Sequence, residues 1–277
     1  MKTIQSKSLL TLIIILFIIG FSTSAENFIK PGIYNVNNPG DSTDESSHRD
    51  MYLIYNPNRV LYPENLEEYR ENSQDYIKRY SVRERSYIIH MLKKGQKYFP
   101  QALDIFDKYG VPHEFQVLPA LESNWSAHAV SPAGAVGYWQ FMSTLAREYG
   151  LKIGGANDER KNFTKATHAA AKFFRDQLDY FDGDILLTVA AYNCGPGRVR
   201  SSIKRSKVKD ANFYDIKDHL PAETRRFVNK FISLNVIATN YENFIAKNLD
   251  FSEPHLLQIA ATDSMVLPDY SVSRNAL

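Results

Sequence analysis

Apolar residues recur three and four positions apart through residues 75–243, the spacing that places them on one face of a helix. Amphipathic stretches at 101–109 and 163–181 predict two helices, and a third long helix is predicted to begin near residue 220. Residues 185–194 are almost all apolar, so we expect a helix that is buried at the centre of the domain. The pattern therefore predicts an all-α domain over 75–243.

Local signals indicate where the helices begin and end. Ser81, with Glu84 three residues later, has the pattern of a capping box and predicts that a helix begins there. Gly110 is placed to end the helix before it, and Pro112 suits the first position of the next one. That next helix is predicted to end near Glu122, which places this carboxylate beside the loop that follows.

The first 25 residues have the features of a secretory signal peptide. Lys2 and Lys7 give a positive start, residues 9–21 are nearly all apolar, and residues 23–25 are small. These features predict export to the periplasm or cell envelope. An uncleaved leader that associates with the membrane is the alternative, although the apolar run is short for a full span of about 20 residues.

Two further segments show no motif of known chemistry. Residues 26–74 contain four prolines and many Asn, Asp and Ser, which predicts an irregular N-terminal extension. Residues 244–277 are expected to form a short C-terminal tail, with a short strand or an extended segment at 256–260.

The composition excludes some functions. Without Lys2 and Lys7 of the leader, 31 of the 33 basic residues remain, against 31 acidic ones. This balance gives no reason to expect a nucleic-acid partner. Cys194 is the only cysteine, so no internal disulfide can form, and the seven histidines show no metal-ligand spacing. We therefore expect neither a metal nor a cofactor.

Glu122 is a candidate for catalysis because it lies among apolar residues. Burial disfavours the charged form of a carboxyl group and raises its pKa, so that it can act as a general acid near neutral pH. Taken alone, the residue is more typical of a helix-end glutamate that faces water. The apolar neighbours are Phe115, Leu118, Leu121 and Trp125.

Four ordered blocks add to this candidate. They are Glu122 with Ser123; Ser131 with Gly134, Ala135 and Gly137; Trp139 with Gln140; and Ala190, Ala191, Tyr192 and Asn193. In this order and spacing they resemble the lytic transglycosylase and goose-type lysozyme superfamily, whose catalytic unit is the SLT domain. The residues at 118–119 and 220–225 look most like its D-type, membrane-bound members. The resemblance covers about 75–241 and implies a lysozyme-like fold with a loop that lines a groove.

The resemblance also implies a reaction and a set of site residues. The family cleaves the β-1,4 bond between N-acetylmuramic acid (MurNAc) and N-acetylglucosamine (GlcNAc) in peptidoglycan without water, in cell-wall turnover or remodelling. The products are 1,6-anhydromuramoyl ends. Glu122 would be the acid and then the base, with Ser123 orienting its carboxyl group. The residues expected to bind the glycan strand are Ser123, Ser131, Gln140, Tyr192 and Asn193. Trp139 is expected either to stack on a sugar or to lie in the core, and we predict a monomer.

Three alternatives remain at this point. Most glycosidases need two carboxylates, and residues 123–147 contain no Asp or Glu. A goose-type lysozyme-like hydrolase would therefore need a second carboxylate from elsewhere, for which Asp158 is the candidate. The other two alternatives are an inactive wall-binding protein and a structural helical scaffold. Retention of Glu122, Gln140 and Tyr192 is evidence against the former, and the loop at 131–140 against the latter.

Overall fold

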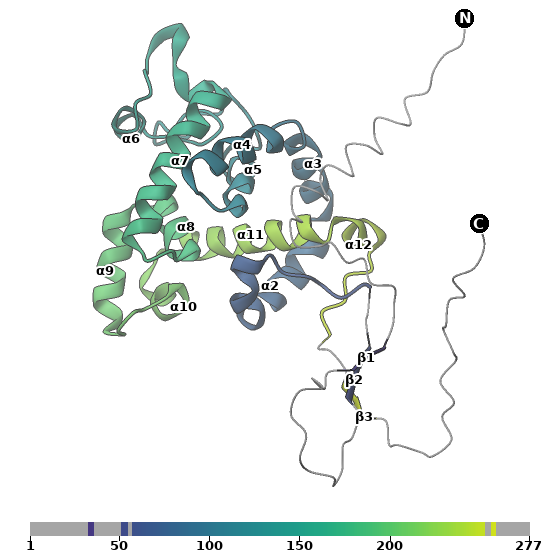
Figure 1. Cartoon of the computed structure of the whole chain (residues 1–277). Coiled ribbons are helices and arrows are strands. Elements are labelled where there is room, and N and C mark those ends of the chain that lie inside the picture. Colours follow the sequence, from purple (N-terminus) through teal and green to yellow (C-terminus); the bar gives the residue numbers. More distant parts are fainter. Residues whose placement is uncertain (1–32, 36–50, 55–56, 253–255, 259–277) are drawn as a thin grey trace, which may run out of the picture. The chain divides into compact units, whose positions relative to one another are not determined.

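The computed structural model describes residues 33–35, 51–54, 57–252 and 256–258 (Figure 1). These residues fall into two compact units, a helical body over Val60–Leu249 and a second unit that contains a small sheet. The predicted signal peptide lies outside the described residues. Among the helices described, none is both long enough and apolar enough to cross a membrane.

The body is built from helices and loops, which confirms the all-α prediction for this part of the chain. Its α-helices are α2 (Arg70–Arg83), α3 (Arg85–Gly95), α4 (Phe99–Tyr109), α5 (Leu118–Ser123), α6 (Ser143–Glu148), α7 (Phe163–Tyr180), α8 (Ile185–Cys194), α9 (Pro196–Ser206), α10 (Phe213–Ile216), α11 (Ala222–Thr239) and α12 (Tyr241–Ala246). Its 3₁₀ helices are η1 (Glu64–Tyr69), η2 (His113–Val117), η3 (Gly155–Asn157), η4 (Glu159–Lys161) and η5 (Lys217–His219).

Helix α11 runs through the middle of the body and packs against α2, α5 and α8 (Figure 1). Residues 231–238 of α11 are buried without a break. Residues 185–191 of α8 are also all buried, as predicted. Aromatic rings connect α8 and η2 through α7: the ring centroids of Phe115 and Phe174 lie 4.4 Å apart, and those of Phe174 and Tyr192 5.2 Å apart. This packing holds the C-terminal end of α8 in place.

The body begins before residue 75, where the sequence pattern placed the start of the domain. Val60, Leu66 and Tyr69 are all buried, so the chain joins the core well before α2 begins. Leu66 and Tyr69, three positions apart, are the buried residues of η1, so the expected irregular extension does not continue to residue 74.

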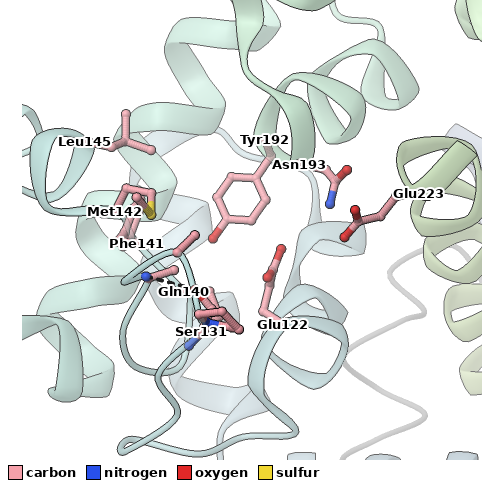
Figure 2. A pocket seen from close by; sticks show the side chains of 12 residues that line it. Glu122, Ser131, Gln140, Phe141, Met142, Leu145, Tyr192, Asn193 and Glu223 are labelled. Atoms are coloured by element: carbon pink, nitrogen blue, oxygen red, sulfur yellow. Dashed lines mark hydrogen bonds between the residues drawn. The ribbon is translucent and has the colours of Figure 1, made fainter. Parts of the chain in front are cut away.

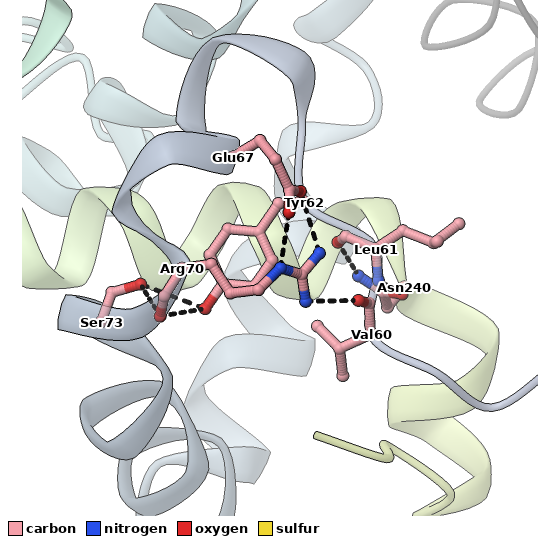
Figure 3. Close-up of polar contacts among 7 residues, drawn as sticks. All are labelled: Val60, Leu61, Tyr62, Glu67, Arg70, Ser73 and Asn240. Atoms are coloured by element: carbon pink, nitrogen blue, oxygen red, sulfur yellow. Dashed lines mark hydrogen bonds and ion pairs between the residues drawn. The ribbon is translucent and has the colours of Figure 1, made fainter. Parts of the chain in front are cut away.

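The side chain of Asn240 holds the segment that enters the body (Figure 3). Its amide oxygen accepts a hydrogen bond from the backbone N–H of Leu61 (2.9 Å), and its amide nitrogen donates to the carbonyl of Leu61 (2.6 Å). Arg70 donates to the carbonyl of Val60 (3.1 Å) and forms an ion pair with Glu67. The entry of the chain is thereby joined to the C-terminal end of α11.

The capping box predicted at Ser81 is wrong. Helix α2 continues through Ser81, whose hydroxyl donates to the carbonyl of Lys78 (3.0 Å), and α3 begins at Arg85 without a side-chain cap. Tertiary packing decides the outcome: Ile77, Tyr80 and Ser81 are buried on one continuous face of α2, so the helix is not interrupted there.

The helix predicted to start at Pro112 is divided in two. Residues 113–117 form the 3₁₀ helix η2, and α5 begins at Leu118. Pro119 lies in the first turn of α5, where its missing N–H leaves no helical hydrogen bond unmade. As predicted, Gly110 ends α4, in a left-handed conformation (φ 60°). The result is a short α5 that carries Glu122 in its last turn.

The second unit contains an antiparallel sheet in the order β1 (Ile33–Asn35), β2 (Met51–Ile54) and β3 (Leu256–Gln258). Tyr34 pairs with Leu53, and Tyr52 pairs with Leu257. The strand expected near 256–260 therefore exists, and it pairs with a strand from the N-terminal extension.

Candidate active site

A cleft of about 420 Å³ lies in the helical body (Figure 2). It is bordered by α5, α6, α8, α11 and the loop over residues 126–142, which we call the cleft loop. The lining residues are Glu122, Ser131, Pro132, Ala133, Ala135, Gln140, Phe141, Met142, Leu145, Tyr192, Asn193 and Glu223. The cleft thus brings together all the predicted site residues except Ser123.

Glu122 stands just before an unusual helix end. The next two positions after Ser123 are Asn124 and Trp125, which both have left-handed backbone conformations (φ 48° and 59°). Such strain in non-glycine residues persists only where surrounding contacts enforce it. Here Lys94 donates to the carbonyl of Asn124 (2.6 Å), and the buried Trp125 indole donates to the carbonyl of Met91 (3.0 Å). Helix α3 therefore fixes the end of the helix that carries Glu122.

The carboxyl group of Glu122 is enclosed by protein, although the residue as a whole is half-buried. Among the described residues it has no hydrogen-bond or ion-pair partner. Burial, and secondly the negative charge of Glu223, raise the pKa of Glu122 to about 8. A large fraction of Glu122 is therefore protonated at neutral pH, as general acid catalysis requires.

Hydrogen bonds between side chains and the backbone give the cleft loop its shape. Ser131 Oγ accepts from the N–H of Ala135 (3.0 Å). Gln140 has a left-handed backbone (φ 48°), and its side-chain nitrogen donates to the carbonyls of Ala129 (3.2 Å) and Gly137 (2.9 Å). The loop uses the nitrogen of the Gln140 amide, which leaves its amide oxygen for a ligand.

Ser123 connects α5 to the cleft loop. Its hydroxyl donates to the carbonyl of Tyr138 (2.9 Å), with the carbonyl of Pro119 also within reach (3.1 Å), and it accepts from the N–H of Ser126 (3.2 Å). The Ser123 hydroxyl is therefore bonded to backbone groups, and it makes no hydrogen bond to the Glu122 carboxyl.

Tyr192 and Asn193 reach the cleft from the end of α8. The Tyr192 hydroxyl donates to the carbonyl of Trp139, and burial raises its pKa well above the ordinary value, so it keeps its proton. The amide oxygen of Asn193 accepts from the Thr224 hydroxyl (2.8 Å). Trp139 itself is fully buried and its indole donates to Thr167 (3.0 Å), so it is a core residue and cannot stack on a sugar.

The second carboxylate of the cleft is Glu223, and the suggestion of Asp158 is wrong. Asp158 forms a buried ion pair with Arg160 and does not line the cleft. Glu223, in the first turn of α11, faces the cleft with Glu122 and Asn193 (Figure 2). In the sequence, Glu223 stood out only as part of the 220–225 segment that resembles the D-type members. Nothing in that segment indicated a role for it.

The described residues contain no group of three or more His, Cys, Asp or Glu side chains that could hold a metal ion.

The sequence around this cleft matches a known protein family. Residues 105–214 match the family model described as the Transglycosylase SLT domain. This chain carries an SLT domain. Glu122, the cleft loop and Tyr192 all lie inside the matched residues of the SLT domain, whereas Glu223 lies beyond them.

Curated relatives are consistent with the SLT domain. The chain is 36% identical over 184 residues to membrane-bound lytic murein transglycosylase D of Escherichia coli K12. That alignment covers 66% of this chain and 39% of the relative, so the chain spans well under half of its length. Peptidoglycan transglycosylase gp16 of Escherichia phage T7 is 39% identical over 79 residues, which are 28% of this chain and 6% of that protein.

Among solved structures, the 70 kDa soluble lytic transglycosylase of Escherichia coli aligns with a TM-score of 0.40 at 22% identity. The alignment covers 52% of this chain and 24% of that one.

Proposed function

We propose that this protein is a peptidoglycan lytic transglycosylase that cleaves the β-1,4 bond between MurNAc and GlcNAc and leaves 1,6-anhydromuramoyl ends. The observation that carries the proposal is the enclosed carboxyl group of Glu122, with a pKa of about 8, in a cleft formed largely by an SLT domain. The names of the two relatives described above support the same reaction class.

The reaction requires one carboxyl group that acts twice. Protonated Glu122 first donates its proton to the glycosidic oxygen, so the bond from that oxygen to C1 of MurNAc breaks and GlcNAc leaves with a free 4-hydroxyl. The 2-acetamido group of MurNAc stabilises the positive centre at C1. Anionic Glu122 then takes the proton of the C6 hydroxyl, whose oxygen bonds to C1 and closes the anhydro ring. Water is not consumed, and Glu122 ends protonated as it began.

The other cleft residues are proposed to hold the sugar. The free amide oxygen of Gln140 can accept a hydrogen bond from an acetamido N–H. Ser131 and Asn193 line the same cleft and supply further polar contacts. Tyr192 donates to the carbonyl of Trp139, so we assign it the role of fixing the cleft loop beside the sugar. Ser123 is proposed to do the same from α5, in place of a direct sugar contact.

The cleft carboxylate Glu223 favours a second candidate, a hydrolase of the goose-type lysozyme kind. In that reaction Glu223 would activate a water molecule while Glu122 protonates the leaving oxygen. In the transglycosylase, by contrast, Glu223 acts on the pKa of Glu122 and is dispensable for closing the ring.

A digest of purified peptidoglycan, read by mass spectrometry, distinguishes the two candidates. We expect ends that carry 1,6-anhydromuramic acid from the wild type and from Glu223→Gln, and no products from Glu122→Gln. Reducing muramic acid ends, one water heavier and lost in Glu223→Gln, would establish the hydrolase. No cleavage by a wild type that binds wall would favour a wall-binding protein.

We propose the cellular setting from the leader and the name of the relative. Residues 1–25 would export the chain to the periplasm or cell envelope, either with cleavage or as a membrane-associated leader. There a monomer would act on glycan strands in cell-wall turnover or remodelling.

A further inference from the structure

Asp158 and Arg160 form a buried ion pair next to the cleft loop. Both side chains are 8% exposed, and the pair is bidentate: Arg160 Nη2 lies 2.7 Å from Asp158 Oδ2, and Arg160 Nε lies 3.0 Å from Oδ1. The backbone N–H of Arg160 also donates to Asp158 (3.1 Å). A planar guanidinium held by two bonds has a fixed orientation, because both its position and its plane are set.

The remaining nitrogen of this guanidinium points to the cleft loop and its end. Arg160 Nη1 donates to the backbone carbonyl of Phe141 (3.1 Å) and lies within hydrogen-bond reach of the Gly134 carbonyl (3.4 Å) and the Ser143 hydroxyl (3.5 Å). These contacts lie on both sides of Gln140. One buried side chain therefore connects the tip of the cleft loop to its C-terminal end.

The backbone of Arg160 forms a second contact with the loop. A Cβ atom added to Gly137, which has φ 83°, would lie 2.0 Å from the carbonyl oxygen of Arg160. The loop and η4 thus lie in direct backbone contact, which only glycine permits.

We propose that Arg160, oriented by Asp158, is a positioning residue that sets the shape of the cleft loop and hence the affinity for the glycan. The inference rests on the proposed function, because it assigns the loop to sugar binding. Arg160 acts through the backbone carbonyl of Phe141 in the loop, whereas the end of the helix that carries Glu122 is held by Lys94 of α3. Loss of the Asp158–Arg160 pair should therefore raise KM and leave the protonation of Glu122 unchanged.

The test compares Asp158→Asn and Arg160→Lys with the wild type. Lysine keeps the charge but lacks the planar fork, so it cannot bind Asp158 and the loop together. We expect KM for peptidoglycan to rise about tenfold in both variants, with kcat within about twofold and an unchanged alkaline limb of the pH–rate profile. Glu159→Gln is the matched control, because its ion pair with Lys165 lies on the same segment but contacts no loop residue; its KM should not change.

Binding of the protein to peptidoglycan, measured without cleavage, tests this inference separately from the proposed function. Retention on insoluble peptidoglycan is measured for Glu122→Gln alone and combined with Asp158→Asn or Arg160→Lys, so that no turnover is needed. Weaker retention of the double variants supports the positioning role of Arg160, even if the wild type cleaves nothing. Unchanged retention and unchanged KM, with a lower melting temperature, would overturn the inference and leave the pair a role in stability alone.

Discussion

At the scale of single residues, two carboxyl groups share the cleft in different surroundings. Glu122 is enclosed and has no polar partner among the described residues, whereas Glu223 is exposed at the start of α11. Burial makes the anion of Glu122 costly, and the second charge adds to that cost. When two neighbouring carboxyl groups lie in different environments, their pKa values differ, and the group with the raised pKa can act as the general acid.

The first prediction concerns the pH dependence of activity. Because the proposed reaction starts from protonated Glu122, activity should fall as the pH rises through about 8. Glu223→Gln removes the neighbouring negative charge, so this alkaline limb should move to lower pH by about half a unit. The measurement is kcat/KM against pH, with Glu159→Gln as the control. A limb that stays in place in Glu223→Gln would contradict the electrostatic link.

The second prediction concerns stability. The pKa of Glu122 is raised from its ordinary value of 4.5 to about 8 on folding. Its contribution to stability is therefore complete below pH 4.5 and is lost as the pH rises through about 8. Glutamine cannot ionise, so at pH 9 Glu122→Gln should be more stable than the wild type by on the order of 2 kcal/mol, a value reduced for the partial exposure of the residue.

Urea unfolding of both proteins at pH 5 and pH 9 checks this. The advantage of Glu122→Gln should nearly vanish at pH 5. An advantage that is equal at both values would show that ionisation of Glu122 is not its cause.

Single residues differ in how far the sequence predicted them. Glu122 and Tyr192 were predicted because each belongs to one of the four ordered blocks that carry the family resemblance; Glu122 taken alone was more typical of a helix-end glutamate that faces water. Glu223 reaches the cleft only because α11 packs against α5 and α8, and no local pattern contains that packing. Ser123 was predicted as a partner of the carboxyl group beside it, yet its hydroxyl bonds to backbone groups that the fold brings near.

At the scale of elements, the end of α3 packs so closely against Phe99 of α4 and Trp125, which follows α5, that one position leaves no room for a side chain. A Cβ atom added to Gly95 would lie 2.7 Å from ring atoms of both Phe99 and Trp125, which are buried. Trp125 follows the helix end that carries Glu122, so this contact supports α5.

The third prediction follows from this packing. In an open helix, Gly→Ala stabilises by up to about 1 kcal/mol. At Gly95 overpacking should outweigh that gain, and Gly95→Ala should destabilise by about 1–2 kcal/mol and lower kcat through Trp125. Gly197→Ala is the control, because only Arg200 lies near its added atom, at 3.8 Å. Denaturant unfolding should give opposite signs for the two variants; stabilisation by both would show that α3 has room to move.

Element boundaries show the limit of local signals. Gly110 ends α4 as predicted, and Asp184 caps α8, because a left-handed glycine and a capping carboxylate act within one turn. The Ser81 signal was equally clear and failed, because packing of α2 on α11 carried the helix through it.

At the scale of the whole helical body, the fold depends on a contact between residues 179 positions apart. The Asn240 side chain pairs with both backbone groups of Leu61 as a strand would, and also donates to Val236 (2.7 Å) in its own helix. Asn240 is buried, and loss of its side-chain amide would remove three hydrogen bonds at once.

The fourth prediction is that Asn240→Ala destabilises the body by about 2–3 kcal/mol, since each lost hydrogen bond is worth about 1 kcal/mol. Asn229→Ala is the control, because the Asn229 amide donates to the Arg225 carbonyl within the same helix, α11 (3.0 Å); it should cost less than about 1 kcal/mol. Thermal unfolding checks both variants, and equal losses would show that the Leu61 contact adds nothing.

The same pairing has a mechanical consequence. Leu61 lies where the chain enters the helical body, and Asn240 lies near the place where it leaves. Tension on the two flanking segments therefore enters and leaves the body at neighbouring points. The load is carried by the bonds of Asn240 and Arg70 (Figure 3), and α5 and the cleft loop lie outside that path. Pulling on the two flanking segments should therefore leave the position of Glu122 unchanged.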